Sequence, residues 1–169
     1  ETMPRLAVRL GGVELEGFDL DGGRQRLHGD TLSVVRDTAT LLENAGYELP
    51  STDPRWSAWL EATPLIQSGD QRIRNQAIAA TGGTTDPAEA ARLLTEWVHG
   101  ALHKTIVPSV PSAVQVLESL QGDCNEHTVL YVALARAIGL PARTAVGLVH
   151  IRGRFYYHAW PEVMLRGRW

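Results

Sequence analysis

Cys124 and His158 are the two residues of this sequence whose types and spacing best support covalent chemistry. Cys124 is the only cysteine among 169 residues and lies in Gly-Asp-Cys-Asn-Glu-His, residues 122–127. His158 follows it in the aromatic run Tyr-His-Ala-Trp. A cysteine thiolate is a strong nucleophile, and an imidazole can take up its proton and later return it to a leaving group. The pair therefore predicts a cysteine nucleophile with a histidine as general base.

The residues around Cys124 place it at a predicted helix N-terminus. Asp123 is a favourable N-cap, which we interpret as a cap rather than a catalytic acid, and Glu126 completes a capping-box pattern. Unpaired N–H groups and the positive end of the helix dipole favour a thiolate at the first helical residue. A lone cysteine is more often a buried structural thiol, and it cannot form an intramolecular disulfide. The capped helix start and the downstream histidine reverse that preference.

The elements that must position the pair are a helix and a β-hairpin. Apolar residues recur at helical spacing from residue 124 to 138, and Gly139 with Pro141 supplies the stop, so we expect a helix buried along one face. Residues 142–150 lack helical periodicity and lead through Arg-Gly-Arg into a second strand-like run, which predicts a hairpin.

Strand alternation defines which side chains accompany the histidine. The period of two puts Tyr156, His158, Trp160 and Glu162 on one face of the second strand. If the helix packs on this sheet with its N-terminus beside the middle of the strand, His158 reaches the sulfur.

Three motifs in order resemble the bacterial branch of the transglutaminase-like superfamily. They are residues 122–127, the run Ala-Arg-Ala-Ile-Gly-Leu-Pro-Ala-Arg at 135–143, and Tyr-His-Ala-Trp-Pro-Glu-Val at 157–163. The match extends from about Asp86 to the C-terminus. The resemblance implies a papain-like α+β fold, with the nucleophilic cysteine at a helix N-terminus packed on an antiparallel sheet that carries the histidine. It also implies acyl transfer on amides through a thioester, which water or an amine resolves.

One residue of the family pattern is missing from this sequence. The resemblance implies an aspartate on the strand after the histidine strand, where it orients the imidazole, and no such residue precedes the last residue, Trp169. We expect that it follows in a longer parent protein and that the fragment alone is weakly active or inactive. Glu162 lies on the histidine face, but two residues along the strand is too far to replace it.

The remaining site candidates would surround the pair. The backbone N–H of Cys124 is the natural first donor of an oxyanion hole, and Gln115, Gln121 or another backbone amide is the second. Tyr156 and Trp160 flank the histidine and would line the site or fill the core.

Three further histidines have simpler interpretations. His127, which follows Cys124 in the helix, is expected to support the core or the cap. His99 and His103 are four residues apart on a predicted helix and could supply half of a zinc site, but solvated helix histidines are the preferred interpretation. We therefore expect neither a metal nor a cofactor.

Composition limits the partners. Sixteen basic and nineteen acidic side chains give a net charge of −3 without a basic run, which argues against nucleic acid. No stretch approaches the roughly 20 apolar residues that span a bilayer, and residues 1–5 lack a signal-peptide pattern. We expect a protein or peptide substrate. For the bacterial parent we suggest an extracytoplasmic or cell-envelope location.

The rest of the chain predicts two parts. Residues 1–50 are β-rich, with a possible hairpin at Gly11-Gly12 followed by strand-like residues 13–20, and resemble the remnant of a larger β-domain. The transglutaminase-like core would then occupy residues 51–169. Within it, helices are expected near residues 56–60 and 73–78, from Asp86 to about His103, and from Ser112 to Leu120, with a proline-punctuated loop at 106–111.

Two classes of function remain open from the sequence. The first is cysteine-dependent acyl transfer on peptide or glutamine-type amides, with hydrolysis slightly favoured over crosslinking because water is always present. The second is a non-catalytic peptide-binding or scaffold module that retains the fold. A zinc site at His99 and His103 is a third and weaker hypothesis.

Overall fold

The computed structural model describes residues 4–18, 20–36, 45–107 and 110–169. The chain forms two compact units, a small one before residue 44 and a larger one from residue 44 onward. Residues 37–44 of the predicted β-rich segment and residues 108–109 of the predicted loop lie outside the described residues.

The first unit contains a three-stranded antiparallel sheet. Its strands are β1 (Arg5–Arg9), β2 (Gln25–His28) and β3 (Thr31–Val35), in the order β1-β3-β2. The predicted hairpin at Gly11-Gly12 is wrong, because β1 pairs with β3 and the described residues between 13 and 20 form no strand. The apolar residues of β1 meet their apolar partners on a strand that is distant in sequence.

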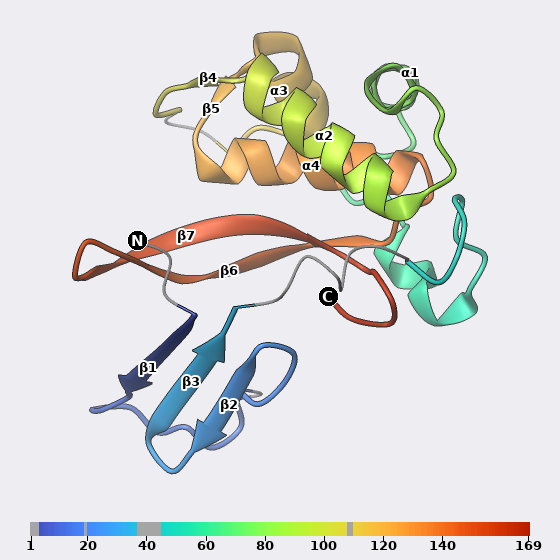
Figure 1. Cartoon of the computed structure of the whole chain (residues 1–169). Coiled ribbons are helices and arrows are strands. Elements are labelled where there is room, and N and C mark those ends of the chain that lie inside the picture. Colours follow the sequence, from blue (N-terminus) through green and yellow to red (C-terminus); the bar gives the residue numbers. More distant parts are fainter. Residues whose placement is uncertain (1–3, 19, 37–44, 108–109) are drawn as a thin grey trace. The chain divides into compact units, whose positions relative to one another are not determined.

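The second unit combines helices with a long β-ribbon (Figure 1). After a 3₁₀ helix η2 (Pro54–Trp59), its helices are α1 (Gln71–Thr81), α2 (Pro87–Ala101), α3 (Ala113–Ser119) and α4 (Cys124–Ala137). Short strands β4 (His103–Lys104) and β5 (Gln121–Gly122) pair in parallel, and β6 (Ala142–Ile151) pairs antiparallel with β7 (Arg154–Val163). The unit is thus α+β, as predicted.

Local capping explains where the helices begin. The Asp86 carboxylate accepts from the N–H of Ala88 at 2.9 Å, with Pro87 at the first helical position. Ser112 and Gln115 form a reciprocal capping box on α3. Both starts agree with the sequence prediction. The end of α2 does not, because His103 belongs to β4.

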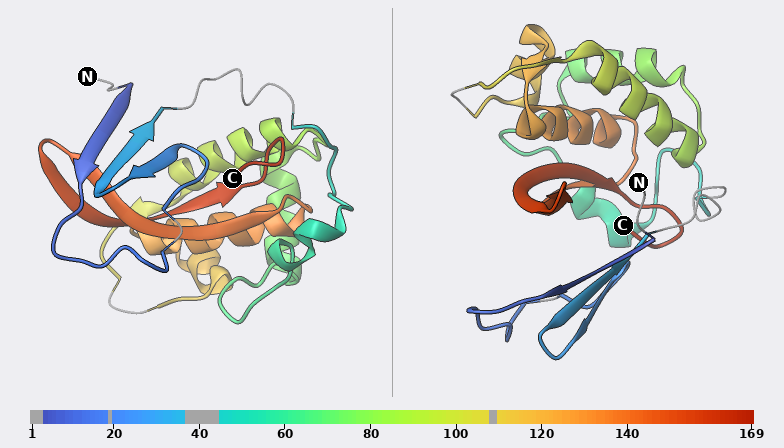
Figure 2. Two further views of the ribbon diagram at one scale, coloured as in Figure 1. Left: turned by 90° about the horizontal axis from the view of Figure 1, so that it is seen from below. Right: turned by 60° about the vertical axis from the view of Figure 1, so that its left-hand side comes forward.

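α4 is the central element of the second unit. Figures 1 and 2 show the four helices gathered on one side of the β6–β7 ribbon, with α4 next to β7. All seven residues from 130 to 136 are buried, so α4 is enclosed rather than buried along a single face as predicted. The reason is that α1, α2 and α3 all pack on α4, and their fully buried Ile73, Leu94 and Val116 share one core with Leu130 and Leu134.

No helix in the described ranges combines the length and apolar character required to cross a bilayer.

Tyr131 on α4 makes the stability of this core sensitive to alkali. Its hydroxyl donates to the carbonyl of Ala91 at 3.0 Å, and burial raises the pKa of Tyr131 to about 12. The pKa in the unfolded chain is about 10, so the native state retains a proton that the unfolded state loses between these values. We expect this group to leave the free energy of unfolding unchanged below pH 10 and to lower it by roughly 2–3 kcal/mol by pH 12.

Urea unfolding of the wild-type protein and Tyr131→Phe between pH 8 and 11.5 measures this effect. The alkaline loss should be smaller in the phenylalanine variant. Equal slopes in the two proteins would show that Tyr131 is not a source of the alkaline loss.

Candidate active site

Cys124 is the first residue of α4, as the sequence predicts, and its thiol is free and half-buried. The preceding Asp123 is extended, with φ −111° and ψ −151°, which is the conformation of an N-cap. As the first helical residue, Cys124 has a backbone N–H without an intrahelical acceptor. The nucleophile candidate and one backbone donor therefore occupy the same helix end.

Glu126 of the capping box bonds the backbone of Asp123, the residue before the cysteine. The N–H of Asp123 donates to Oε2 of Glu126 at 2.8 Å, and Glu126 is buried, with 4% of its surface exposed. Glu126 also packs on Gly122, where an added Cβ would lie 2.1 Å from the Glu126 Cβ. The motif therefore requires glycine at position 122, because the capping glutamate fills the space of any side chain there.

Two side chains of the next turn hold the backbone carbonyls around the cysteine. Nδ1 of His127 lies 2.8 Å from the carbonyl oxygen of Asp123, which also accepts the N–H of His127 at 3.1 Å. The hydroxyl of Thr128 donates to the carbonyl oxygen of Cys124 at 2.7 Å. His127 thus supports the cap, one of the two roles expected from the sequence.

His158 lies on β7, the strand that packs most closely on α4. Arg136, near the end of α4, donates from Nε to the carbonyl of Ala142 at 2.9 Å, and Ala142 pairs with Val163 of β7. α4 and β7 run in the same direction (Figure 1). By the rise per residue, Cys124 lies about 18 Å from Arg136 along the helix, and His158 lies about 17 Å from Val163 along the strand.

Arg136 itself is buried, with 8% of its surface exposed, and its side chain donates to backbone carbonyls. Besides Ala142, it donates from Nη1 to the carbonyl oxygen of Glu61 at 2.6 Å. It therefore ties the loop before α1 and the start of β6 to α4.

The histidine face of β7 follows the predicted alternation. Half-buried His158 shares its face with Trp160 and Glu162, whereas Ala159, on the other face, is buried. In the described part of the chain no hydrogen bond joins Cys124 to His158. Contacts between a nucleophile and its base are often long before substrate binds.

Trp160 is fixed beside the histidine by a glycine and a carboxylate. Gly147 pairs with His158 across the ribbon, and an added Cβ at Gly147 would lie 2.9 Å from the indole ring. The indole N–H donates to Glu162 at 3.4 Å, and the same carboxylate accepts Nε of Arg143 at 2.8 Å. Glu162 is thus engaged by Arg143 and Trp160. The sequence analysis missed Gly147 and Arg143; the cross-strand pairing of Arg143 with Glu162 is the signal that could have indicated this network.

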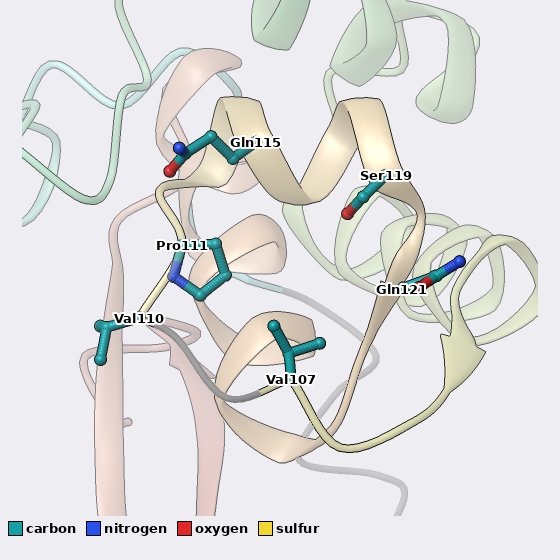
Figure 3. Close-up of a pocket in the computed structure, with 6 residues that line it drawn as sticks. All are labelled: Val107, Val110, Pro111, Gln115, Ser119 and Gln121. Carbon is teal, nitrogen blue, oxygen red and sulfur yellow. The ribbon is translucent and has the colours of Figure 1, made fainter.

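The other predicted site residues lie farther out. Tyr156, two residues before His158, is 48% exposed. Gln115 and Gln121 lie on opposite sides of a hollow of about 290 Å³ beside α3 and β5 (Figure 3), which is lined by Val107, Val110, Pro111, Gln115, Ser119 and Gln121. Oε1 of Gln115 accepts the N–H of Ser112 in the α3 cap. Gln121 is within roughly 11 Å of Cys124 along the chain.

The zinc hypothesis loses its premise. His99 lies on α2 and His103 on β4, so the two histidines do not share a helix. Across the described ranges, no group of three or more His, Cys, Asp or Glu side chains could hold a metal ion.

Comparisons with known proteins agree with this architecture. Residues 74–169 match the sequence profile of the transglutaminase-like superfamily. Among curated protein sequences, none matches the chain significantly.

Two solved structures share the fold. One is a proposed cysteine protease from Cytophaga hutchinsonii, with 22% identity, a TM-score of 0.65, and coverage of 82% of this chain and 49% of that protein. The other is the periplasmic domain of TgpA from Pseudomonas aeruginosa bound to ethylmercury, with 18% identity, a TM-score of 0.52, and coverage of 98% and 62%. The chain thus spans about half of the first protein and less than two thirds of the second.

Proposed function

Because this chain belongs to the transglutaminase-like superfamily, we propose that it provides the core of an enzyme that transfers acyl groups from amides through a thioester on Cys124. Family membership supports a general role as a cysteine-dependent peptidase or acyltransferase. The roles of Cys124 and His158, the thioester reaction and the peptide substrates are our proposal.

In the proposed mechanism His158 accepts and returns one proton in each half-reaction on Cys124. His158 takes the thiol proton, and the thiolate attacks the amide carbonyl to give a tetrahedral oxyanion. The C–N bond breaks, and His158 returns the proton to the departing amine or ammonia. Water or a second amine then attacks the thioester and gives up a proton to His158, the C–S bond breaks, and His158 returns that proton to the Cys124 thiolate. The aspartate that would orient the imidazole is not among these residues, and Glu162 is bound to other partners.

The observation that carries the proposal is the position of Cys124 at the start of α4, where a half-buried free thiol and its own backbone N–H share the N-terminus of a helix that packs on β7, the strand of His158. A half-buried thiol at a helix N-terminus is typical of reactive rather than structural cysteines. For the acceptor we propose water, hence amide or peptide hydrolysis. Transglutaminase-type crosslinking has the same first half-reaction and differs only in using an amine as the acceptor. The ammonia-release assay described below distinguishes the two reactions.

Thiol reactivity tests the proposal against a non-catalytic scaffold. We expect Cys124 to be alkylated by iodoacetamide at pH 6 faster than free cysteine, because a thiolate is the reactive species. The readout is the mass increase with time, and Cys124→Ala controls for alkylation elsewhere. Ammonia release from a glutamine-containing peptide, with and without a primary amine, then separates hydrolysis from amine incorporation. Alkylation no faster than free cysteine would contradict the proposal and favour a peptide-binding module.

A further inference from the structure

We propose that His127 is a positioning residue for oxyanion stabilisation. By holding the carbonyl of Asp123, its imidazole aims the N–H of Cys124, on the other side of the same peptide unit, at the substrate oxygen that becomes negatively charged. This inference rests on the proposed role of Cys124 as nucleophile, and it adds a specific function for a residue one turn further along α4.

The geometry of the peptide unit carries the argument. A trans peptide is planar, with its C=O and N–H pointing in opposite directions, so fixing one group fixes the other. The oxygen of Asp123 accepts two donors, the N–H of His127 at 3.1 Å and Nδ1 of His127 at 2.8 Å. Both lie in the first turn of α4, so they draw the carbonyl along the helix. The N–H of Cys124 therefore points away from the helix, out of its N-terminus.

The neighbouring backbone groups are held as well. The N–H of Asp123 donates to the buried carboxylate of Glu126, and the carbonyl of Cys124 accepts the hydroxyl of Thr128. Side chains in the first turns of α4 thus bond three backbone groups: the N–H and the carbonyl of Asp123, and the carbonyl of Cys124. These bonds align the N–H of Cys124 as a donor before the reaction. Donors that are fixed before the reaction stabilise a developing charge without reorganisation.

The protonation of the ring separates this role from that of a base. A carbonyl oxygen can only accept, so Nδ1 of His127 carries the proton and Nε2 of the neutral ring carries the lone pair. Within the described residues, Nε2 of His127 is a buried atom without a hydrogen-bond partner. Nδ1 of His127 is therefore engaged by a carbonyl and Nε2 is enclosed, so His127 is not placed to act as the base. His158 remains the acceptor of the Cys124 proton.

The test compares two reactions of the same thiol. Acylation by p-nitrophenyl acetate forms an oxyanion, whereas alkylation by iodoacetamide does not. Loss of one oxyanion donor costs about 10²–10³-fold in other enzymes, and a misaimed donor should cost part of this. We expect His127→Leu to slow single-turnover acylation about 10- to 100-fold and to change alkylation by less than about twofold. His127→Asn retains a donor near Nδ1 and should restore most of the acylation rate.

Controls separate the possible failures. His99→Leu removes an exposed histidine of α2 and should leave both rates unchanged. If His127→Leu does not fold, His127→Asn and His127→Asp, which are matched in shape, give the same comparison of a donor with an acceptor. Normal acylation in the Leu or Asp variant, or equal loss of both reactions, would overturn the inference alone. A wild-type protein that alkylates but forms no acyl-enzyme would overturn the proposed function and this inference together.

Discussion

Cys124→Ser is expected to lower kcat/KM for amide cleavage by at least about 10³-fold, because a serine hydroxyl stays protonated where a thiol ionises. The change replaces one atom in a half-buried side chain, and the capping bonds around it involve the backbone of residues 123 and 124 rather than the sulfur. We therefore expect the far-UV circular dichroism and the Tm to match the wild type.

Steady-state kinetics on a peptide amide measure this effect, and Cys124→Ala should be equally inactive. An isosteric serine variant with more than a few per cent of the wild-type activity would show that the sulfur is not the nucleophile. The proposal would then have to be abandoned, whichever residue replaced it.

His158→Ala is expected to reduce the same rate by about 10²–10⁴-fold, the usual contribution of a general base. The two residues should act as a unit, so the double variant with Cys124→Ala should be no slower than Cys124→Ala alone. His150→Ala provides the matched control, since His150 is also half-buried on the ribbon but packs against Phe155 in a tilted arrangement, with ring centroids 5.1 Å apart.

The rate of alkylation gives an independent measurement for His158. A thiolate is the reactive species, and His158 is the proposed acceptor of the thiol proton. We therefore expect His158→Ala to slow alkylation by iodoacetamide at pH 6. Identical rates in the two proteins would exclude His158 as the partner of the thiol.

Local signals in the sequence predict much of the helical architecture. Asp86 with Pro87, Ser112 with Gln115, and Asp123 with Glu126 each mark a helix start within a few residues, and capping depends only on neighbours in the chain. The same holds for the β6–β7 ribbon, whose strands are joined by a short turn and show clear alternation.

Non-local pairing explains what the sequence analysis missed. The partner of β1 is β3, which is separated from it by a glycine-rich stretch that suggests a nearer hairpin. The enclosure of α4 results from three helices converging on it, and a one-dimensional apolar pattern does not show this convergence. Within the site, the sequence indicates the cap at Asp123 but not that the His127 ring bonds its carbonyl, because this contact depends on a side-chain rotamer.

Arg136 shows how residue type can mislead protein engineering. An arginine near a helix end would be chosen as a replaceable surface charge, but here its fork joins two chain segments through carbonyl oxygens inside the molecule. Lysine, with one compact ammonium group, cannot reproduce two diverging bonds. A mutant library that diversifies charged positions should therefore leave residue 136 unchanged, as it would leave Leu134. At both positions burial in the protein interior limits which substitutions are tolerated.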